Sequence, residues 1–125
     1  MGPLLIKTRE IKELIMAKDY VKAIEMKSID TATIGAGAWS AINAGGTEGA
    51  CFFIRITNDS NVDVSISYDG IKYHEYVRTG DSIEVNFQAN ASPGNFVSKL
   101  RKGTVLHARG GAGTGLVYVS GYYNG

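Results

Sequence analysis

Apolar and polar residues alternate along the middle of the chain, between residues 51 and 87. The segment 62–68, Val-Asp-Val-Ser-Ile-Ser-Tyr, places its apolar side chains on one face and its polar side chains on the other. The segment 83–87 repeats this alternation with Ile, Val and Phe at every second position. The pattern predicts antiparallel strands that bury one face and expose the other.

Turn-forming residues separate these predicted strands. We expect the apolar run 51–56 to end at a turn formed by Thr57 to Asn61, because these residue types hydrogen-bond their own backbone. Asp69-Gly70 is typical of a tight turn that needs positive φ angles, and Thr79-Gly80-Asp81 predicts the next turn. Three or four antiparallel strands follow from this part of the chain alone.

The flanking segments predict further short strands. We expect a break in the pattern at 28–31 and a flexible loop at 43–49, which contains three glycines. A glycine-rich turn, 110–115, precedes the last predicted strand. The additional strands are expected at 20–27, around Trp39 and Ile42, at 104–109 and at 116–123.

The last predicted strand carries bulky residues on both faces. Tyr118 and Tyr122 share one face, and Tyr123 lies on the other with Val117 and Val119. Strands that are apolar on both faces are typical of the centre of a sheet, or of a sheet covered by a partner. We therefore expect this strand to be central or to be covered.

The first seventeen residues follow a different pattern. Thr8 can cap a helix, and Ile11, Leu14 and Ile15 recur at the spacing of one helical face. The spacing predicts a short amphipathic helix from about Arg9 to Ala17. A helix this short is marginal in water, so its apolar stripe must dock on the β domain or on a neighbouring subunit.

Length and composition agree with an all-β fold. The chain has 125 residues, enough for one domain, and its 16 glycines against 2 prolines indicate many turns. We predict an N-terminal helical arm, residues 1–17, followed by an antiparallel β-sandwich, residues 18–125. The sandwich is of jelly-roll or immunoglobulin-like type, because about eight short strands are separated by regular turns.

Charge and cysteine content restrict the function. The net charge of +1 gives no general attraction to nucleic acid or to an anionic membrane, and no apolar run is long enough to span a bilayer. Cys51 is the only cysteine, which excludes an internal disulfide and a cysteine-based zinc site. We expect neither a membrane partner, nor a specific nucleic acid, nor a metal or other cofactor.

Motifs that suggest chemistry have simpler structural explanations. The segment 110–115 lacks the lysine and helix of a phosphate loop, and the spacing of Asp59, Asn61 and Asp63 departs from a calcium loop after its third ligand. Glu75 and Glu84 could approach across strands as a carboxylate pair, but solvated strand faces explain them better. The sequence thus favours a protein without catalytic activity.

Basic and aromatic residues near the C-terminus suggest a binding surface. Tyrosine suits half-wet protein interfaces, and it can also stack on sugars or bases. We rank a partner protein first, a glycan second and nucleic acid third. The residues are Lys99, Arg101, Lys102 and Arg109 with Tyr118, Tyr122 and Tyr123.

Several strand and turn segments carry a resemblance to small structural proteins of tailed bacteriophage particles. These segments are Ile56–Ser60, Val64–Gly70, Gly80–Ser82, Gly103–Val105 and Gly113–Tyr122. The resemblance implies a β-sandwich that decorates or cements the capsid, or that forms part of the head-tail neck. It implies no catalytic residues, and the N-terminal arm lies outside it.

The function expected from this resemblance is that of a non-enzymatic virion protein, made in the host cytoplasm and repeated as a homo-oligomer. Its partners would be the major capsid protein, the portal, or neck and tail proteins. The alternative is a carbohydrate-binding module or adhesin that uses the tyrosine-rich last strand. Candidate interface residues are Ile11, Leu14, Ile15, Tyr118, Tyr122 and Tyr123.

Deletion of Met1 to Ile15 tests the predicted arm. We expect the shortened chain to keep its β-rich circular dichroism spectrum, because the arm lies outside the predicted sandwich. Its assembly, measured by analytical ultracentrifugation, should be weaker than that of the full chain. Loss of the fold itself would contradict the assignment of these residues to a docking arm.

Overall fold

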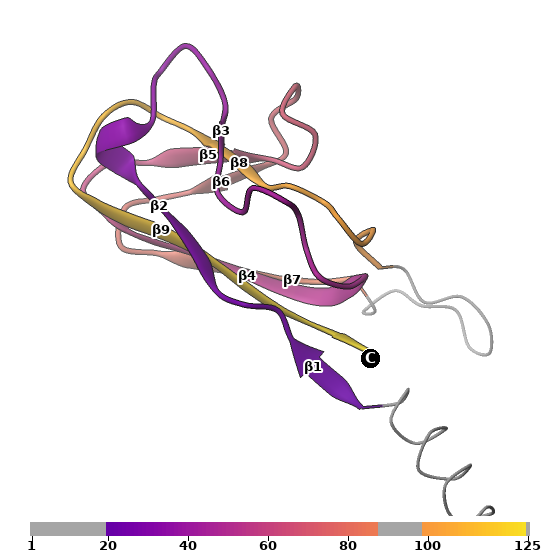
Figure 1. Ribbon diagram of the computed structural model, residues 1–125. Coiled ribbons are helices and arrows are strands. Elements are labelled where there is room, and N and C mark those ends of the chain that lie inside the picture. Colours follow the sequence, from indigo (N-terminus) through magenta and orange to yellow (C-terminus); the bar gives the residue numbers. More distant parts are fainter. Residues whose placement is uncertain (1–19, 88–98, 125) are drawn as a thin grey trace, which may run out of the picture.

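The computed structural model describes residues 20–87 and 99–124, which form two antiparallel β-sheets (Figure 1). The described part contains one short 3-10 helix, η1 (Thr31–Thr33), and no α-helix. The helix predicted for residues 9–17 lies outside the described residues. The strands are β1 (Val21–Ala23), β2 (Lys27–Asp30), β3 (Ser40–Ala41), β4 (Cys51–Ser60), β5 (Val64–Ser67), β6 (Glu75–Val77), β7 (Ser82–Asn86), β8 (His107–Arg109) and β9 (Gly115–Asn124).

The strands pair in a nested order. Sheet A has the order β1-β9-β4-β7, with β2 also paired to β9, and sheet B has the order β3-β8-β5-β6. Within these sheets β1 and β2 pair with β9, β3 with β8, β4 with β7, and β5 with β6. The first half of the chain therefore pairs with the second half in reverse order. As predicted, β9 is a central strand of its sheet.

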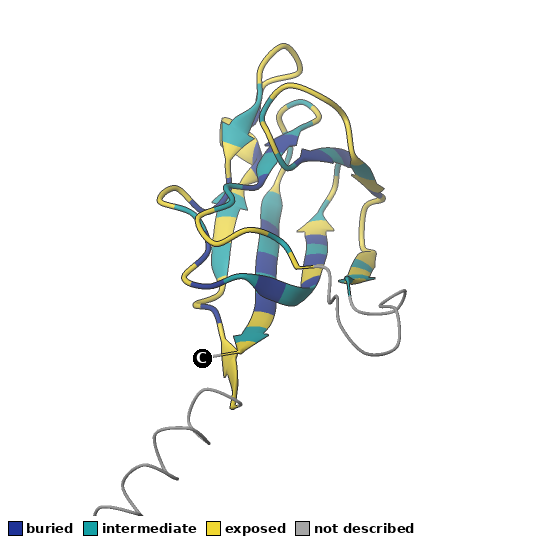
Figure 2. Cartoon of the chain, turned by 90° about the vertical axis from the view of Figure 1, so that its right-hand side faces the viewer, coloured by how far each residue is buried: buried dark blue, intermediate teal, exposed yellow. Residues whose placement is uncertain are grey.

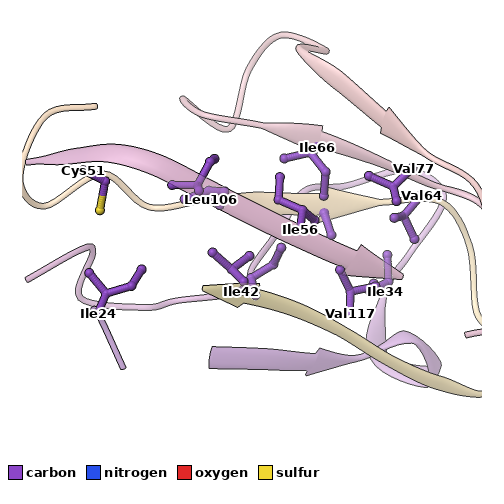
Figure 3. Close-up of a cluster of buried hydrophobic side chains, with 13 residues drawn as sticks. Ile24, Ile34, Ile42, Cys51, Ile56, Val64, Ile66, Val77, Leu106 and Val117 are labelled. Atoms are coloured by element: carbon purple, nitrogen blue, oxygen red, sulfur yellow. The ribbon is translucent and has the colours of Figure 1, made fainter. Parts of the chain in front are cut away.

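One hydrophobic core receives side chains from both sheets (Figure 3). Ile54 and Ile56 from β4 are fully buried, as is Ile66 from β5. The intervening residues, such as Arg55 and Ser65, are more exposed, and buried and exposed bands alternate along the strands in Figure 2. The alternation predicted for 83–87 is thus present in β7, and that predicted for 62–68 holds in β5 from Val64 to Ile66. It is wrong at Ser67, which was expected on the polar face but is fully buried, where its hydroxyl donates to Asp69 and accepts the Gly70 backbone N–H.

The turn predicted at Thr57 to Asn61 is wrong, because β4 continues through Ser60. Asn58 explains the extension. Its side chain is fully buried, and its Nδ2 donates to the carbonyl oxygens of Val62 at 2.8 Å and Val77 at 3.0 Å. A residue type that is common in turns is accommodated here because tertiary partners satisfy its amide.

One further expectation is corrected. Residues 28–30 do not break the strand pattern, because residues 27–30 form β2 along β9 and Ile29 packs against the core, and the strand ends only where η1 begins at Thr31. The loop 43–49, for which we predicted flexibility, is anchored at its start to the segment 104–106. Its Asn43 is buried and accepts a hydrogen bond from the Leu106 backbone at 2.7 Å, and it donates one to the Thr104 carbonyl at 3.1 Å.

The turn residues behave largely as predicted. Gly70 and Gly80 have positive φ angles of 74° and 77°. Since an L side chain is strained at such angles, glycine is required at both positions. The connection at Gly70 is longer than the predicted tight turn, because β5 ends at Ser67 and β6 begins only at Glu75.

Replacement of Asn58 by Ala should destabilise the protein strongly. The change removes the Asn58 donor from the carbonyls of Val62 and Val77 and leaves a cavity in place of a fully buried side chain, so we expect a loss of roughly 2–4 kcal/mol in the free energy of unfolding. Urea unfolding followed by circular dichroism measures it. The exposed Asn124 offers a control, and an effect of Asn58→Ala no larger than that of Asn124→Ala would contradict this role.

Candidate functional site

The three tyrosines that the sequence suggested as interface residues do not form one surface. Tyr118 and Tyr122 lie on the outer face of sheet A, whereas Tyr123 packs against the core. Tyr123 lies so close to Gly49 that a Cβ added there would be 2.1 Å from its ring. Tyr123 is therefore partly buried on the opposite side of β9 from Tyr118 and Tyr122. The other candidates, Ile11, Leu14 and Ile15, lie outside the described residues.

The outer face of sheet A exposes apolar side chains from several strands. Met26 is 59% exposed and Val21 is 60% exposed, and both lie beside β9. The rings of Phe53 and Tyr122 are in contact, with their centroids 5.9 Å apart. We call Val21, Met26, Phe53, Tyr118 and Tyr122 the sheet A face. A shallow hollow of about 350 Å³ lies within it, lined by Met26, Arg55, Thr57, Tyr118 and Ser120.

An ion pair crosses this face between neighbouring strands. Arg55 of β4 lies opposite Glu84 of β7 in the antiparallel register, and their side chains meet at 3.0 Å. The Arg55 guanidinium also lies 6.0 Å from the centroid of the Phe53 ring. Because both ionic side chains are about half exposed, this pair adds at most about 1 kcal/mol to stability. It places one positive and one negative charge beside the apolar side chains. The register also puts the exposed Asp30 and Asp59 on this outer face, next to Leu116.

A second concave surface lies on the outer face of sheet B. Val64 and Ile66 point into the core, so Ser65 between them faces outward. Tyr76 lies directly opposite Ser65 in the β5–β6 register. Together with the end of the connecting loop, these residues form a hollow of about 380 Å³, which we call the sheet B pocket. It is lined by Ser65, Tyr73, His74, Glu75 and Tyr76.

The Tyr73 ring packs against an aromatic and a cationic side chain, Trp39 and Arg109. The Trp39 ring meets it edge to face, with centroids 4.9 Å apart. The Arg109 guanidinium lies 5.5 Å from the Tyr73 ring and 5.7 Å from the Trp39 ring. Arg109 is itself oriented by a hydrogen bond from its Nε to the Ala36 carbonyl at 2.8 Å. These contacts fix one side of the Tyr73 ring, which nevertheless remains 62% exposed.

Tyr76 is held by a different partner. Its hydroxyl donates to Asp63 at 2.8 Å, and Asp63 also accepts the Thr79 backbone N–H at 2.9 Å. The Thr79 bond, followed by the Tyr76 bond, lowers the pKa of Asp63 below its ordinary value. The same bond to Asp63 raises the pKa of Tyr76, so the tyrosine remains a hydrogen-bond donor. The Tyr76 ring thus has a fixed position at the pocket.

The loop that carries Tyr73 is organised by Asp69. Its Oδ1 accepts the backbone N–H groups of Ile71 at 2.8 Å and Lys72 at 3.0 Å, and the Ser67 hydroxyl donates to it at 2.9 Å. The Lys72 and Ile71 bonds, in that order, lower the pKa of Asp69 from 3.8 to about 2. The ionised carboxylate therefore shapes the turn that leads into the pocket.

His74 and Glu75 are among the lining residues of the pocket, and both contact Tyr68. The Tyr68 backbone N–H donates to His74 Nδ1 at 3.0 Å, which assigns the proton of a neutral imidazole to Nε2. The Tyr68 hydroxyl donates to Glu75 Oε2 at 3.3 Å, and burial followed by the nearby Glu75 charge raises the pKa of Tyr68. Because Glu75 lies opposite the buried Ile66 in the register, its carboxylate points to the inner side of β6, away from Ser65 and Tyr76. The polar side chains available to the pocket are therefore the Ser65 hydroxyl and the His74 imidazole.

Sequence reasoning placed Arg109 incorrectly. Arg109 was expected to share a patch with the tyrosines of the last strand, but it belongs to β8 of sheet B, whereas those tyrosines belong to sheet A. Glu75 and Glu84 likewise lie on different sheets, so they do not form a carboxylate pair. The sheet B pocket was missed because its walls depend on the β5–β6 register. The polar face of 62–68 was the only signal for it.

The remaining motifs have structural roles. Asn61 Oδ1 accepts the Thr114 backbone N–H at 2.8 Å, and Asp63 binds Thr79 and Tyr76, so the suspected calcium ligands bind protein groups. The segment 110–114 connects β8 to β9, as predicted. Across residues 20–87 and 99–124, no group of three or more His, Cys, Asp or Glu side chains is placed to hold a metal ion. In that same part of the chain, no helix has the length and apolarity to cross a membrane.

Comparison with known proteins identifies no family for the chain. No protein-family model and no curated protein matches it. It is similar to a solved structure described as "Crystal structure of PirA", with 9% identity and a TM-score of 0.34, over 83% of this chain and 92% of that one. A likeness of this degree supports no assignment of fold or function.

The Asp69 carboxylate predicts a dependence of stability on pH. Because its pKa of about 2 in the folded state lies below its ordinary value of 3.8, its stabilising effect is present above about pH 4 and is lost as the pH falls toward 2. Replacement by Asn keeps the acceptor oxygen but removes this charge. Urea unfolding midpoints of Asp69→Asn should therefore lie below those of the wild type at pH 6 and approach them at pH 2. A difference that is the same at both pH values would contradict the assignment.

Proposed function

We propose that the chain is a non-enzymatic structural subunit of a bacteriophage particle, which associates with copies of itself and binds capsid or neck proteins. The resemblance of its strand and turn segments to small phage structural proteins supports this. The nested pairing of β1/β2 with β9, β3 with β8, β4 with β7 and β5 with β6 supports a jelly-roll sandwich. Jelly rolls serve as capsid and lectin domains.

The sheet A face is the observation that carries the proposal. Its apolar side chains come from β1, β4 and β9 and from the connection between β1 and β2, so sheet hydrogen bonds hold most of them in fixed positions. Exposed aromatic and methionine side chains are enriched in protein interfaces, and a preformed surface loses little entropy on binding. Tyr118 and Tyr122, the interface candidates from the sequence, both belong to this face.

The charges on the face favour a second copy as the occupant. Arg55 and Glu84 lie side by side and are about half exposed. In an association about a two-fold axis each residue of one copy can meet the opposite charge of the other copy. The face is therefore complementary to itself in charge as well as in apolar character.

The alternative function, a carbohydrate-binding module built on Tyr118 and Tyr122, receives less support from this face. The two rings do not flank a single hollow, because Tyr118 lines the hollow with Met26 and Arg55, whereas Tyr122 packs on Phe53. The aromatic side chains that do flank one hollow belong to sheet B.

A double substitution tests the association. In Met26→Ser/Tyr122→Ser we expect the dissociation constant for self-association, measured by sedimentation equilibrium, to rise at least about tenfold, because both exposed apolar contacts are lost. Ile71→Ser is the matched control, since Ile71 is 75% exposed and lies in the β5–β6 connection of sheet B. A wild-type chain that remains monomeric, or a control that weakens association equally, would contradict this role of the face. Detection of the chain by mass spectrometry in purified particles tests the location independently.

A further inference from the structure

We propose that the sheet B pocket binds a neutral hexopyranose, such as the terminal sugar of a glycan. The proposal rests on the five lining residues and their fixed positions, and it does not depend on the chain being a virion protein. The carbohydrate-binding surface expected from the sequence lay on the last strand, which belongs to sheet A, whereas the site proposed here lies on sheet B. Ser65, Tyr73, His74, Glu75 and Tyr76 make up the site.

The size of the pocket suits a single sugar ring. Its volume of about 380 Å³ lies at the lower end of the range of about 300–1,000 Å³ that is common for small-molecule sites. The hollow lies on the outer face of β5 and β6, where it is open to solvent. Such a shape admits the end of a glycan chain while the next sugar stays outside.

Two preorganised aromatic rings supply the apolar contact. A pyranose presents C–H groups on its faces and hydroxyls around its rim, so it can pack a face on a tyrosine ring. Tyr73 and Tyr76 are 62% and 53% exposed, which leaves ring surface free for this contact. Trp39 and Arg109 hold Tyr73, and Asp63 holds Tyr76. Little side-chain entropy would therefore be lost when a sugar binds.

The polar atoms match hydroxyl groups better than they match a charged ligand. His74 Nε2 is a donor, and Ser65 can both donate and accept. Glu75 lies opposite the buried Ile66, so its carboxylate points to the inner side of β6, where it accepts the Tyr68 hydroxyl. Neighbouring sugar hydroxyls act as donors and acceptors at once, so they can satisfy both Ser65 and His74. The pocket offers no cationic side chain among its lining residues for an acidic sugar.

The two proposed surfaces are compatible in one molecule. The sheet A face and the sheet B pocket lie on the outer faces of opposite sheets, with the hydrophobic core between them. Association through sheet A would leave the pocket open. Several copies would then present several pockets, and weak binding to single sugars would add up through multivalency.

Nuclear magnetic resonance titration of the full chain with the methyl glycosides of glucose, galactose and mannose tests the proposal. We expect saturable shift changes at Tyr73, His74 and Tyr76 with at least one sugar, at a dissociation constant on the order of millimolar. Tyr73→Ala should weaken binding about tenfold, because the stacking ring is lost, while Tyr73→Phe should retain most of it. Ser65→Ala, which removes the outward-facing hydroxyl beside Tyr76, should also weaken binding.

Tyr20→Ser serves as the control, because Tyr20 is a 59% exposed tyrosine next to β1 of sheet A and belongs to neither proposed surface. Absence of saturable shifts with all three sugars would overturn the proposal. Equal weakening by Tyr20→Ser, or unchanged binding in both Tyr73→Ala and Ser65→Ala, would overturn it as well. If Tyr73→Ala fails to fold by circular dichroism, the comparison of Ser65→Ala with the wild type decides. Sedimentation of the wild type without sugar reports on self-association separately.

Discussion

The buried amide of Asn58 is the constraint on which the relation between the two sheets depends. Its side chain donates from sheet A to the carbonyl of Val77 at the end of β6 and to that of Val62 before β5. Its backbone N–H donates to Asp81 at 2.8 Å, and its carbonyl accepts from Gly80 at 2.9 Å. The Ser60 hydroxyl donates to the side-chain oxygen of Asn58, Oδ1. A buried polar group with all these bonds is stable only in one arrangement of the strands, and it penalises alternatives in which the bonds are broken.

The same arrangement of the strands determines which residues lie on the outer faces of the two sheets. Because Asn58 lies on the inner face of β4, Arg55 and Thr57 must face outward toward Tyr118 and Ser120 of β9. On the other sheet, the burial of Val64 and Ile66 turns Ser65 outward, and the register sets Tyr76 beside it. The residues of the two proposed surfaces are therefore positioned by the same packing that stabilises the fold.

The sequence predicts which way side chains point more reliably than it predicts which strands are neighbours. Alternation correctly assigned Val64 and Ile66 to the core and separated Tyr123 from Tyr118. It could not reveal that Arg109 and Tyr73 meet, because they lie 36 positions apart and their contact depends on the pairing of β5 with β8. Asn58 was misassigned for a related reason. Its turn propensity is a local property, whereas the bonds that keep it in β4 are tertiary.

The two faces differ in the physics of recognition that they allow. The sheet A face is broad and apolar with one exposed ion pair, so its contacts gain free energy mainly from buried area and suit a large partner. The sheet B pocket is small, and its rings are already held by Trp39, Arg109 and Asp63, so it suits a small ligand that brings its own hydrogen-bonding groups. A single small pocket of this kind binds weakly. Association through the opposite face would compensate for this weakness, because copies fixed to one another bind a multivalent glycan surface with a high effective concentration.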